Sequence, residues 1–306
     1  VAAEQNIAAT LAEAPLDAVR RAFTFEATER RVLAALKDRV LADGEMIDLD
    51  WVERVIGERR TGHWIGGPGR SDPEAQALGR SYDAIQAAVQ LFKLHAEHRG
   101  RFAFDSGPEL LDAYRKGLFQ FDRVYRDFQT AAAAIRGQGW NLLKDLGDAV
   151  ERLYDQGFLQ PLGVEWSRLL DEGFLDVWTD EACPAQSKFY AQVIGPMLAR
   201  SDRKRAFVII SDAFRYEAAV ELTEKINRQD RREAEVSPML GVVPSYTSLG
   251  MAALLPHETL GFDDRGEVLA DGRSTAGLAG RNRQLESVGG MACQASELIQ
   301  MKVDEA

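Results

Sequence analysis

Two polar residues, Asp212 and Thr247, each follow an apolar stretch where a strand is expected to pass into a helix. A carboxylate such as Asp212 suits a divalent cation, with zinc, manganese and magnesium all compatible. The Thr247 hydroxyl could act as a nucleophile, because a helix N-terminus favours a phosphoryl group and a metal ion lowers the pKa of a hydroxyl. Together the two residues suggest one half of a metal-dependent hydrolase centre.

Both residues also have a purely structural interpretation. Asp212 could cap the helix that contains Tyr216, and Thr247 could cap the helix that it begins, since aspartate and threonine are common N-cap residues. Ser248 is the adjacent competitor for the role of nucleophile. From residue type alone, a helix cap is the more common role at either position.

The elements expected around these residues are two consecutive strand–helix units. Residues 206–210 are a continuous apolar run, typical of a central strand covered on both faces, and a helix is expected over 214–227. A second strand is expected within 233–243 and a second helix over 248–255. Two such units in succession predict a mostly parallel sheet, and ligands bind at the carboxyl ends of its strands.

The rest of the C-terminal region is less regular. Residues 261–288 contain many glycines and indicate a long loop or a short hairpin insertion, whereas 294–302 are expected to be a helix. The predicted fold is therefore a helical domain over residues 1–200, followed by an α/β domain with a mostly parallel sheet over 201–306.

Residues 1–200 are expected to be almost entirely helical. In the helix that starts at Pro73, apolar residues recur every three or four positions on one face, at Leu78, Tyr82, Ile85, Val89 and Phe92. Ser71 or Asp72 can cap this helix, and Gly100 can end it. Further helices are expected over 16–42, 48–60, 111–128, 141–156 and 185–199.

The composition is that of a globular protein, with 306 residues of which 45% are hydrophobic. No apolar stretch reaches the roughly 20 residues that span a bilayer, and the first residues lack the basic start of a secretory signal, so we expect a cytoplasmic protein.

Cys183 and Cys293 have neither disulfide nor metal-site spacing and are expected to be buried thiols. The net charge of −11 does not favour passive docking on nucleic acid.

The segments VIISDAFRYEAA and SPMLGVVPSYTSLGMAALLPH closely resemble the PglZ domain of the alkaline-phosphatase-like superfamily. The segments YRDFQ and WSRLLDEGFLDVW look like the region that precedes this domain in type A PglZ proteins of BREX phage-defence systems. The resemblance rests chiefly on residues 204–257. It implies that Asp212 and Thr247 bind a divalent metal, zinc first, and that Thr247 forms a phosphothreonine intermediate. It also implies BREX proteins as partners and a phosphoester, including nucleic acid, as substrate.

The superfamily completes its site with further Asp and His residues on later strands. His257 is the last histidine and is expected at a helix end, while Asp263 and Asp264 fall in a loop. His95 and His98 are three positions apart on a helix and could meet one ion, but no third ligand is evident. One aspartate and one hydroxyl cannot hold zinc tightly, so we expect these residues to stop before the catalytic domain is complete. The competing hypothesis is a non-catalytic scaffold whose helical domain binds other defence components.

These 306 residues alone are expected to show little or no hydrolysis of a generic aryl phosphate, because the missing ligands leave the metal poorly held. The check is release of p-nitrophenol from p-nitrophenyl phosphate with zinc, manganese or magnesium added. Turnover clearly above that of a blank with metal and no protein would contradict this expectation.

Overall fold

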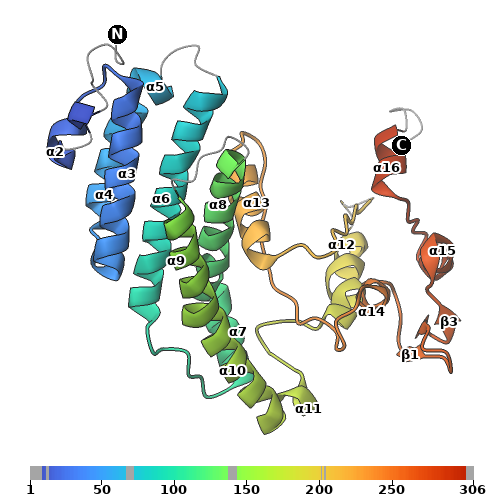
Figure 1. Ribbon diagram of the computed structural model, residues 1–306. Helices are drawn as coiled ribbons and strands as arrows, with labels where there is room; N and C mark the ends of the chain where they lie inside the picture. Colours follow the sequence, from blue (N-terminus) through green and yellow to red (C-terminus); the bar gives the residue numbers. More distant parts are fainter. Residues whose placement is uncertain are drawn as a thin grey trace. The chain divides into compact units, whose positions relative to one another are not determined.

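The computed structural model describes residues 9–11, 14–66, 72–136, 143–200, 202 and 205–300. The chain divides into two compact units, Val1–Gly173 and Phe174–Ala306, and each is described by itself (Figure 1). The division falls at Gly173, whose φ of 106° is a left-handed conformation that interrupts the helical path. The domain boundary expected near residue 200 lies inside the second unit.

The first unit is built from helices. They are α2 (Leu16–Val19), α3 (Glu26–Asp43), η1 (Gly44–Met46), α4 (Leu49–Arg60), α5 (His63–Gly66), α6 (Pro73–His98), α7 (Gly107–Ala113), α8 (Phe119–Arg136), α9 (Lys144–Tyr154) and α10 (Gln160–Leu169). Single π-helical turns, η2 (Tyr114–Leu118) and η3 (Asp155–Leu159), join α7 to α8 and α9 to α10. The helix expected over 111–128 is therefore interrupted, and the start of the one expected over 141–156 lies outside the described residues.

Helix α6 is the centre of this unit, since it packs against α3, α4, α8 and α9 (Figure 1). The residues predicted for its apolar face are all buried: Leu78, Tyr82, Ile85, Val89 and Phe92. Asp72 caps the helix, because its Oδ1 accepts a hydrogen bond from the Ala75 N–H at 3.0 Å. Ser71, the other candidate cap, lies outside the described residues. Gly100, with φ 70°, follows the end of the helix as predicted.

A buried charge cluster ties the N-terminal segment to this bundle. Arg59 on α4 is fully buried and donates two hydrogen bonds to the carboxylate of Glu29 on α3, which is also fully buried. Arg59 Nη1 donates to the carbonyl oxygens of Arg20 at 2.8 Å and Ala22 at 2.9 Å. Burial raises the pKa of Tyr82, so its hydroxyl stays protonated and donates to Glu29 Oε2 at 2.9 Å.

The same bonds explain why the segment expected to be one helix over 16–42 is two helices. The carbonyl oxygens of Arg20 and Ala22 accept from a side chain rather than from the N–H groups of a following helical turn. Helix α2 therefore ends at Val19, and α3 begins only at Glu26. The apolar pattern alone could not predict this break, because its cause is an arginine 39 residues further along the chain.

An ion pair between the buried Glu165 and the exposed Arg168 fixes the loop between α6 and α7 to α10. Glu165 Oε1 accepts from the Phe104 N–H and from Arg168 Nη2, both at 2.7 Å. Arg168 Nη2 also donates to the carbonyl oxygen of Phe104 at 2.7 Å. The hydrogen bonds from Arg168, and then the one from Phe104, lower the pKa of Glu165 from its ordinary 4.5 to about 2.

The second unit contains short helices and a small antiparallel sheet. Its helical elements are α11 (Leu175–Val177), η5 (Gln186–Lys188), η6 (Tyr190–Ile194), α12 (Gly195–Ala199), α13 (Tyr216–Asn227), α14 (Thr247–Ala253), α15 (Gly277–Glu286) and α16 (Ala295–Gln300). Strands β1 (Leu260–Phe262), β2 (Val268–Ala270) and β3 (Arg273–Ser274) pair antiparallel in that order. The hairpin alternative for 261–288 is confirmed, although α15 was not expected there.

The mostly parallel sheet expected in this unit is not found among the described residues. Residues 206–210 form no strand, and their large side chains are exposed, with Phe207 at 79% and Ile209 at 89%. Within 233–243 the described chain forms only an isolated parallel bridge, between Leu240 and Ala185. An apolar run becomes a buried strand only when neighbouring strands pair with it and other elements cover its faces, and no described segment does so here.

The two cysteines differ in burial, and both thiols are free. Cys183 is buried, as expected, but Cys293 is exposed. The prediction was wrong for Cys293 because this residue lies in the irregular segment between α15 and α16 rather than in a core.

Among the described residues, no helix has both the length and the apolar character that crossing a bilayer requires.

Arg59→Met should lower the free energy of unfolding of the helical unit by about 3–5 kcal/mol, because it leaves the Glu29 carboxylate buried without its cation. The measurement is urea unfolding followed by far-UV circular dichroism. Lys144→Met is the matched control: it removes an exposed pair with Asp148, 3.2 Å between charged atoms, and should cost less than about 1 kcal/mol. The double variant Arg59→Met/Glu29→Leu should be more stable than Arg59→Met, and the opposite order would contradict the pairing.

The Glu165 cluster should make stability depend on pH. Because the folded pKa of Glu165 is lowered, its ionised form stabilises the folded state above pH 4.5, and this contribution is lost as the pH falls toward about 2. Glu165→Gln should therefore be less stable than the wild type near neutral pH and should approach it at the acidic end. Thermal unfolding at a series of pH values checks this. A stability difference that does not shrink on acidification would mean that the carboxylate charge is not responsible.

Candidate active site

Asp212 lies just before α13, in the segment that follows the exposed apolar run. Its Oδ1 accepts from the N–H of the next residue, Ala213, at 3.1 Å. Ala213 has a φ of 55°, a left-handed conformation that is uncommon for a residue other than glycine. Helix α13 begins at Tyr216 with Arg215 as its N-cap, and no side chain caps it. Asp212 is therefore not the cap of this helix, which removes its main structural interpretation.

Thr247 is the first residue of α14 and lies next to Asp212. The N-cap position of α14 belongs to Tyr246, and no side-chain hydrogen bond caps the helix. The Thr247 hydroxyl instead donates to Asp212 Oδ2 at 3.1 Å, across 35 residues of sequence. Both side chains are exposed to solvent. The fold thus brings together the two residues that the sequence singled out, with the hydroxyl hydrogen bonded to the carboxylate.

Gln186 holds the segment before Thr247 in place. Its Oε1 accepts from the Val242 N–H at 3.2 Å, and its Nε2 donates to the carbonyl oxygen of Gly250 on α14, also at 3.2 Å. The Gln186 N–H donates to the Leu240 carbonyl oxygen at 2.8 Å. One side chain therefore joins η5, the segment from 240 to 243 and α14. The sequence offered no signal for this role, because it depends on three segments that only the fold brings together.

The apolar side of α14 anchors the same helix. Leu249 and Ala252 are buried on it and pack with Val268 of β2, with Val242 and Leu260 partly buried around them. Burial of apolar side chains is the main source of stability for such a short helix. Thr247 is thus carried by a helix that is fixed from two sides.

The residues present do not make up a complete metal centre. Among the described residues, no group of three or more His, Cys, Asp or Glu side chains is arranged to hold a metal ion. Asp212 and Thr247 supply two oxygen donors, whereas zinc sites in proteins use at least three protein ligands. The pair could contribute to a metal site but cannot form one by itself.

The other four site candidates named from the sequence have different positions and partners. His257 is four residues beyond the end of α14, and its Nδ1 lies 2.7 Å from the Leu255 carbonyl oxygen. Asp263 closes the turn between β1 and β2, because its Oδ1 accepts from the N–H groups of Arg265 and Glu267. Asp264 is exposed in the same turn. Ser248 is exposed one position after Thr247 on α14.

The two neighbouring histidines of α6 do not converge on one point. His95 Nδ1 lies 2.5 Å from Glu45 Oε1, whereas His98 Nδ1 lies 2.9 Å from the carbonyl oxygen of Leu94. The ring of His98 packs edge-on against Phe121, with centroids 5.6 Å apart. Each imidazole thus has its own structural partner.

Comparison with known proteins gives the family. Residues 189–306 match the family described as the BREX system PglZ alkaline phosphatase-like domain. The alkaline phosphatase-like protein BrxZ of Escherichia coli O9:H4 (strain HS) is 36% identical over 280 residues, which are 90% of this chain and 32% of that protein. The alkaline phosphatase-like protein PglZ of Bacillus cereus (strain H3081.97) is 32% identical over 216 residues, 70% of this chain and 23% of that protein.

The chain thus spans about a third or less of the length of the curated relatives it matches. No solved structure matches it at a significant level. The family match includes both Asp212 and Thr247, and the similarity to BrxZ covers most of the helical unit as well. Residues 189–306 therefore belong to the PglZ domain family, and most of the chain is similar to PglZ and BrxZ proteins.

Proposed function

We propose that this chain contributes the nucleophile and one metal ligand to a phosphoester-hydrolysing centre in a protein of a BREX phage-defence system. The observation that carries the proposal is the hydrogen bond of 3.1 Å from Thr247 Oγ1 to Asp212 Oδ2. A hydroxyl in contact with a carboxylate offers a nucleophile and an acceptor for its proton. The description of the matching family domain as alkaline phosphatase-like supports the same reaction class.

In the proposed reaction, Thr247 Oγ1 attacks phosphorus and its proton passes to Asp212 Oδ2. The bond from Oγ1 to phosphorus forms, the bond from phosphorus to the leaving oxygen breaks, and the leaving group takes a proton from solvent. Water then attacks phosphorus and releases one proton to solvent. The bond from Oγ1 to phosphorus breaks, and Thr247 recovers its proton from Asp212, so that the enzyme returns to its starting state.

The proposed cofactor is a divalent metal, zinc first, with manganese and magnesium as alternatives. Thr247 Oγ1 and the other Asp212 oxygen, Oδ1, are the atoms of this chain that would contact it, because both are oxygen donors at the candidate site and Oδ2 is the proton acceptor. A bound ion of this kind supplies Lewis-acid stabilisation of negative charge on phosphoryl oxygens. We propose that further ligands complete this site, since no group of three or more His, Cys, Asp or Glu side chains among the described residues is arranged to hold a metal ion.

We also propose that residues 206–210 form a central strand of a mostly parallel sheet once neighbouring strands pair with them. Their exposed apolar side chains support this, because covering them would remove apolar surface from water. Such a strand would end two residues before Asp212 and would hold that carboxylate at the carboxyl edge of the sheet, where ligands of α/β proteins bind.

The partners and the substrate of the whole protein are also proposals. The partners are other BREX defence proteins, and the helical unit, which has a core of its own, is the part proposed to contact them. The substrate is a phosphoester, with a nucleic acid strand as one form of it. The net charge of −11 makes tight binding to nucleic acid depend on a local basic groove rather than on the overall charge.

Thr247→Ala should abolish phosphoester hydrolysis by the full polypeptide that carries this sequence, with kcat reduced by about 10³-fold or more, because no oxygen remains to attack phosphorus. Asp212→Asn should reduce kcat by about 10²–10⁴-fold through loss of the proton acceptor. Hydrolysis of p-nitrophenyl phosphate and of its bis ester, with each metal in turn, gives the rates. Mass spectrometry of acid-quenched enzyme should find phosphate on Thr247.

Ser248→Ala is the matched control, because it removes the next hydroxyl on the same helix turn. It should leave kcat within about twofold of the wild type. Full activity in Thr247→Ala, or loss of activity only in Ser248→Ala, would show that the nucleophile is assigned wrongly. If phage defence itself survives both Thr247→Ala and Asp212→Asn, the scaffold hypothesis replaces the catalytic one.

A further inference from the structure

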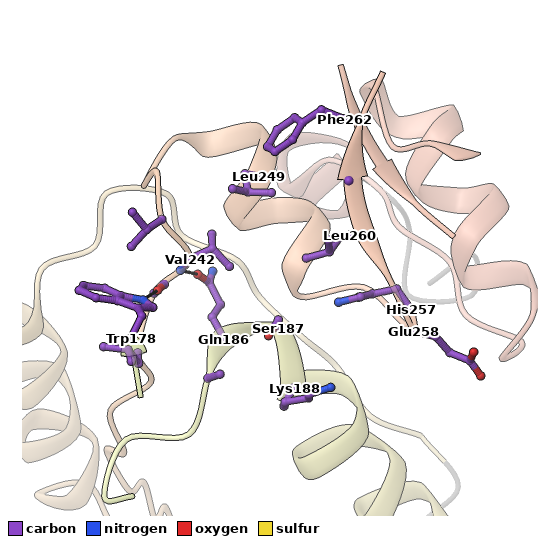
Figure 2. A pocket seen from close by; sticks show the side chains of 15 residues that line it. Trp178, Gln186, Ser187, Lys188, Val242, Leu249, His257, Glu258, Leu260 and Phe262 are labelled. Carbon is purple, nitrogen blue, oxygen red and sulfur yellow. Dashed lines mark hydrogen bonds between the residues drawn. The ribbon is translucent and has the colours of Figure 1, made fainter. Parts of the chain in front are cut away.

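The second unit contains a cavity of about 420 Å³ that is separate from the candidate active site. It lies between the segments 178–188 and 240–243 on one side and α14 and β1 on the other (Figure 2). Neither Asp212 nor Thr247 lines it. Polar and apolar atoms contribute about equally to its wall, whose apolar residues include Trp178, Leu240, Val242, Leu249, Leu260 and Phe262. Its volume lies within the range of sites that bind small organic ligands.

Hydrogen bonds hold the wall of the cavity in place. Gln186, which lines it, uses both ends of its amide on Val242 and Gly250, so the two sides of the cavity are joined. The Trp178 indole N–H donates to the carbonyl oxygen of Gly241 at 2.8 Å. Trp178 has φ 37° and ψ 55°, a left-handed conformation that is strained for a bulky residue. The surrounding contacts must stabilise this backbone conformation. Residues with strained backbone conformations are common at ligand-binding sites.

His257 presents a hydrogen-bond acceptor to the cavity. Its Nδ1 lies 2.7 Å from the carbonyl oxygen of Leu255, which can only accept, so Nδ1 carries the hydrogen. In the neutral ring, Nε2 is then an acceptor. Figure 2 shows the ring directed toward Ser187 and Gln186, across the cavity. A ligand that enters would therefore meet a nitrogen that accepts from a hydroxyl or an amine.

Lys188 supplies a positive charge to the part of the cavity that His257 lines. It is an exposed residue of η5 that lines the cavity, and none of the ion pairs found among the described residues involves its ammonium group. Glu258 also lines the cavity, but its carboxylate points away from His257 and Lys188 in Figure 2. The polar end of the cavity is thus suited to an anionic group.

We propose that this cavity binds a small organic anion that has an aromatic or apolar body and one hydroxyl or amine hydrogen. The apolar residues of the wall contact the body, Lys188 pairs with the anionic group, and His257 Nε2 accepts the hydrogen. The proposal does not depend on the assignment of Thr247 and Asp212, because these residues do not line the cavity.

The test is fluorescence titration of the protein with 8-anilinonaphthalene-1-sulfonate, a probe with an aromatic body, a sulfonate and one N–H group. Lys188→Met and His257→Phe should each raise Kd about tenfold, which corresponds to a loss of ~1.4 kcal/mol. Lys188 is exposed, so Lys188→Met should fold normally, and thermal unfolding checks this. Trp178→Phe should reduce energy transfer from tryptophan to the bound probe.

Lys225→Met is the matched control, because it removes an exposed lysine of α13 that pairs with Glu221 and lies outside the cavity. Its Kd should stay within about twofold of the wild type. The probe also has affinity for exposed apolar surface such as residues 206–210. An unchanged Kd in both Lys188→Met and His257→Phe would show that the probe sits on such a surface and would overturn the proposal.

Discussion

A guanidinium group that is buried in a helical bundle must have partners for its donors, because an unpaired buried charge costs several kcal/mol. Arg59 meets this requirement with the Glu29 carboxylate and with two backbone carbonyl oxygens of the segment between α2 and α3. Its guanidinium carbon also lies 4.1 Å from the ring centroid of Phe23. The position of one side chain therefore determines how α3, α4 and the N-terminal segment fit together, and Tyr82 connects the same cluster to α6.

The candidate site of the second unit is held by contacts of another kind. Its order near Thr247 comes from one amide, that of Gln186, and from a small apolar cluster beneath α14. Asp212 is held differently, since it follows an exposed apolar run and is tied mainly by its bonds to Ala213 and Thr247. The two residues of the candidate pair are thus held differently. Thr247 is the first residue of a helix that is fixed by packing and hydrogen bonds. Asp212 follows a segment that pairs with no strand among the described residues.

Helix α14 also links the candidate active site to the separate cavity. Thr247 is its first residue, and Leu249, two positions later, lines the cavity. The ring of Tyr246, just before Thr247, lies 6.4 Å from that of Phe262 in the cavity wall, measured between centroids. Because Gln186 holds α14 and lines the cavity too, the contacts that position the Thr247 hydroxyl also shape the cavity.

The sequence by itself predicted the helical character of the first unit, the buried face of α6 and a cap at Ser71 or Asp72, because these depend on apolar spacing and residue type within one helix. It also singled out Asp212 and Thr247, and similarity to PglZ proteins supplied the reaction class. It could not predict the break between α2 and α3, the role of Gln186 or the exposure of residues 206–210. The first two depend on hydrogen bonds to residues far away in the chain, and the third depends on whether other strands pair with this segment. Only the tertiary structure could therefore decide them.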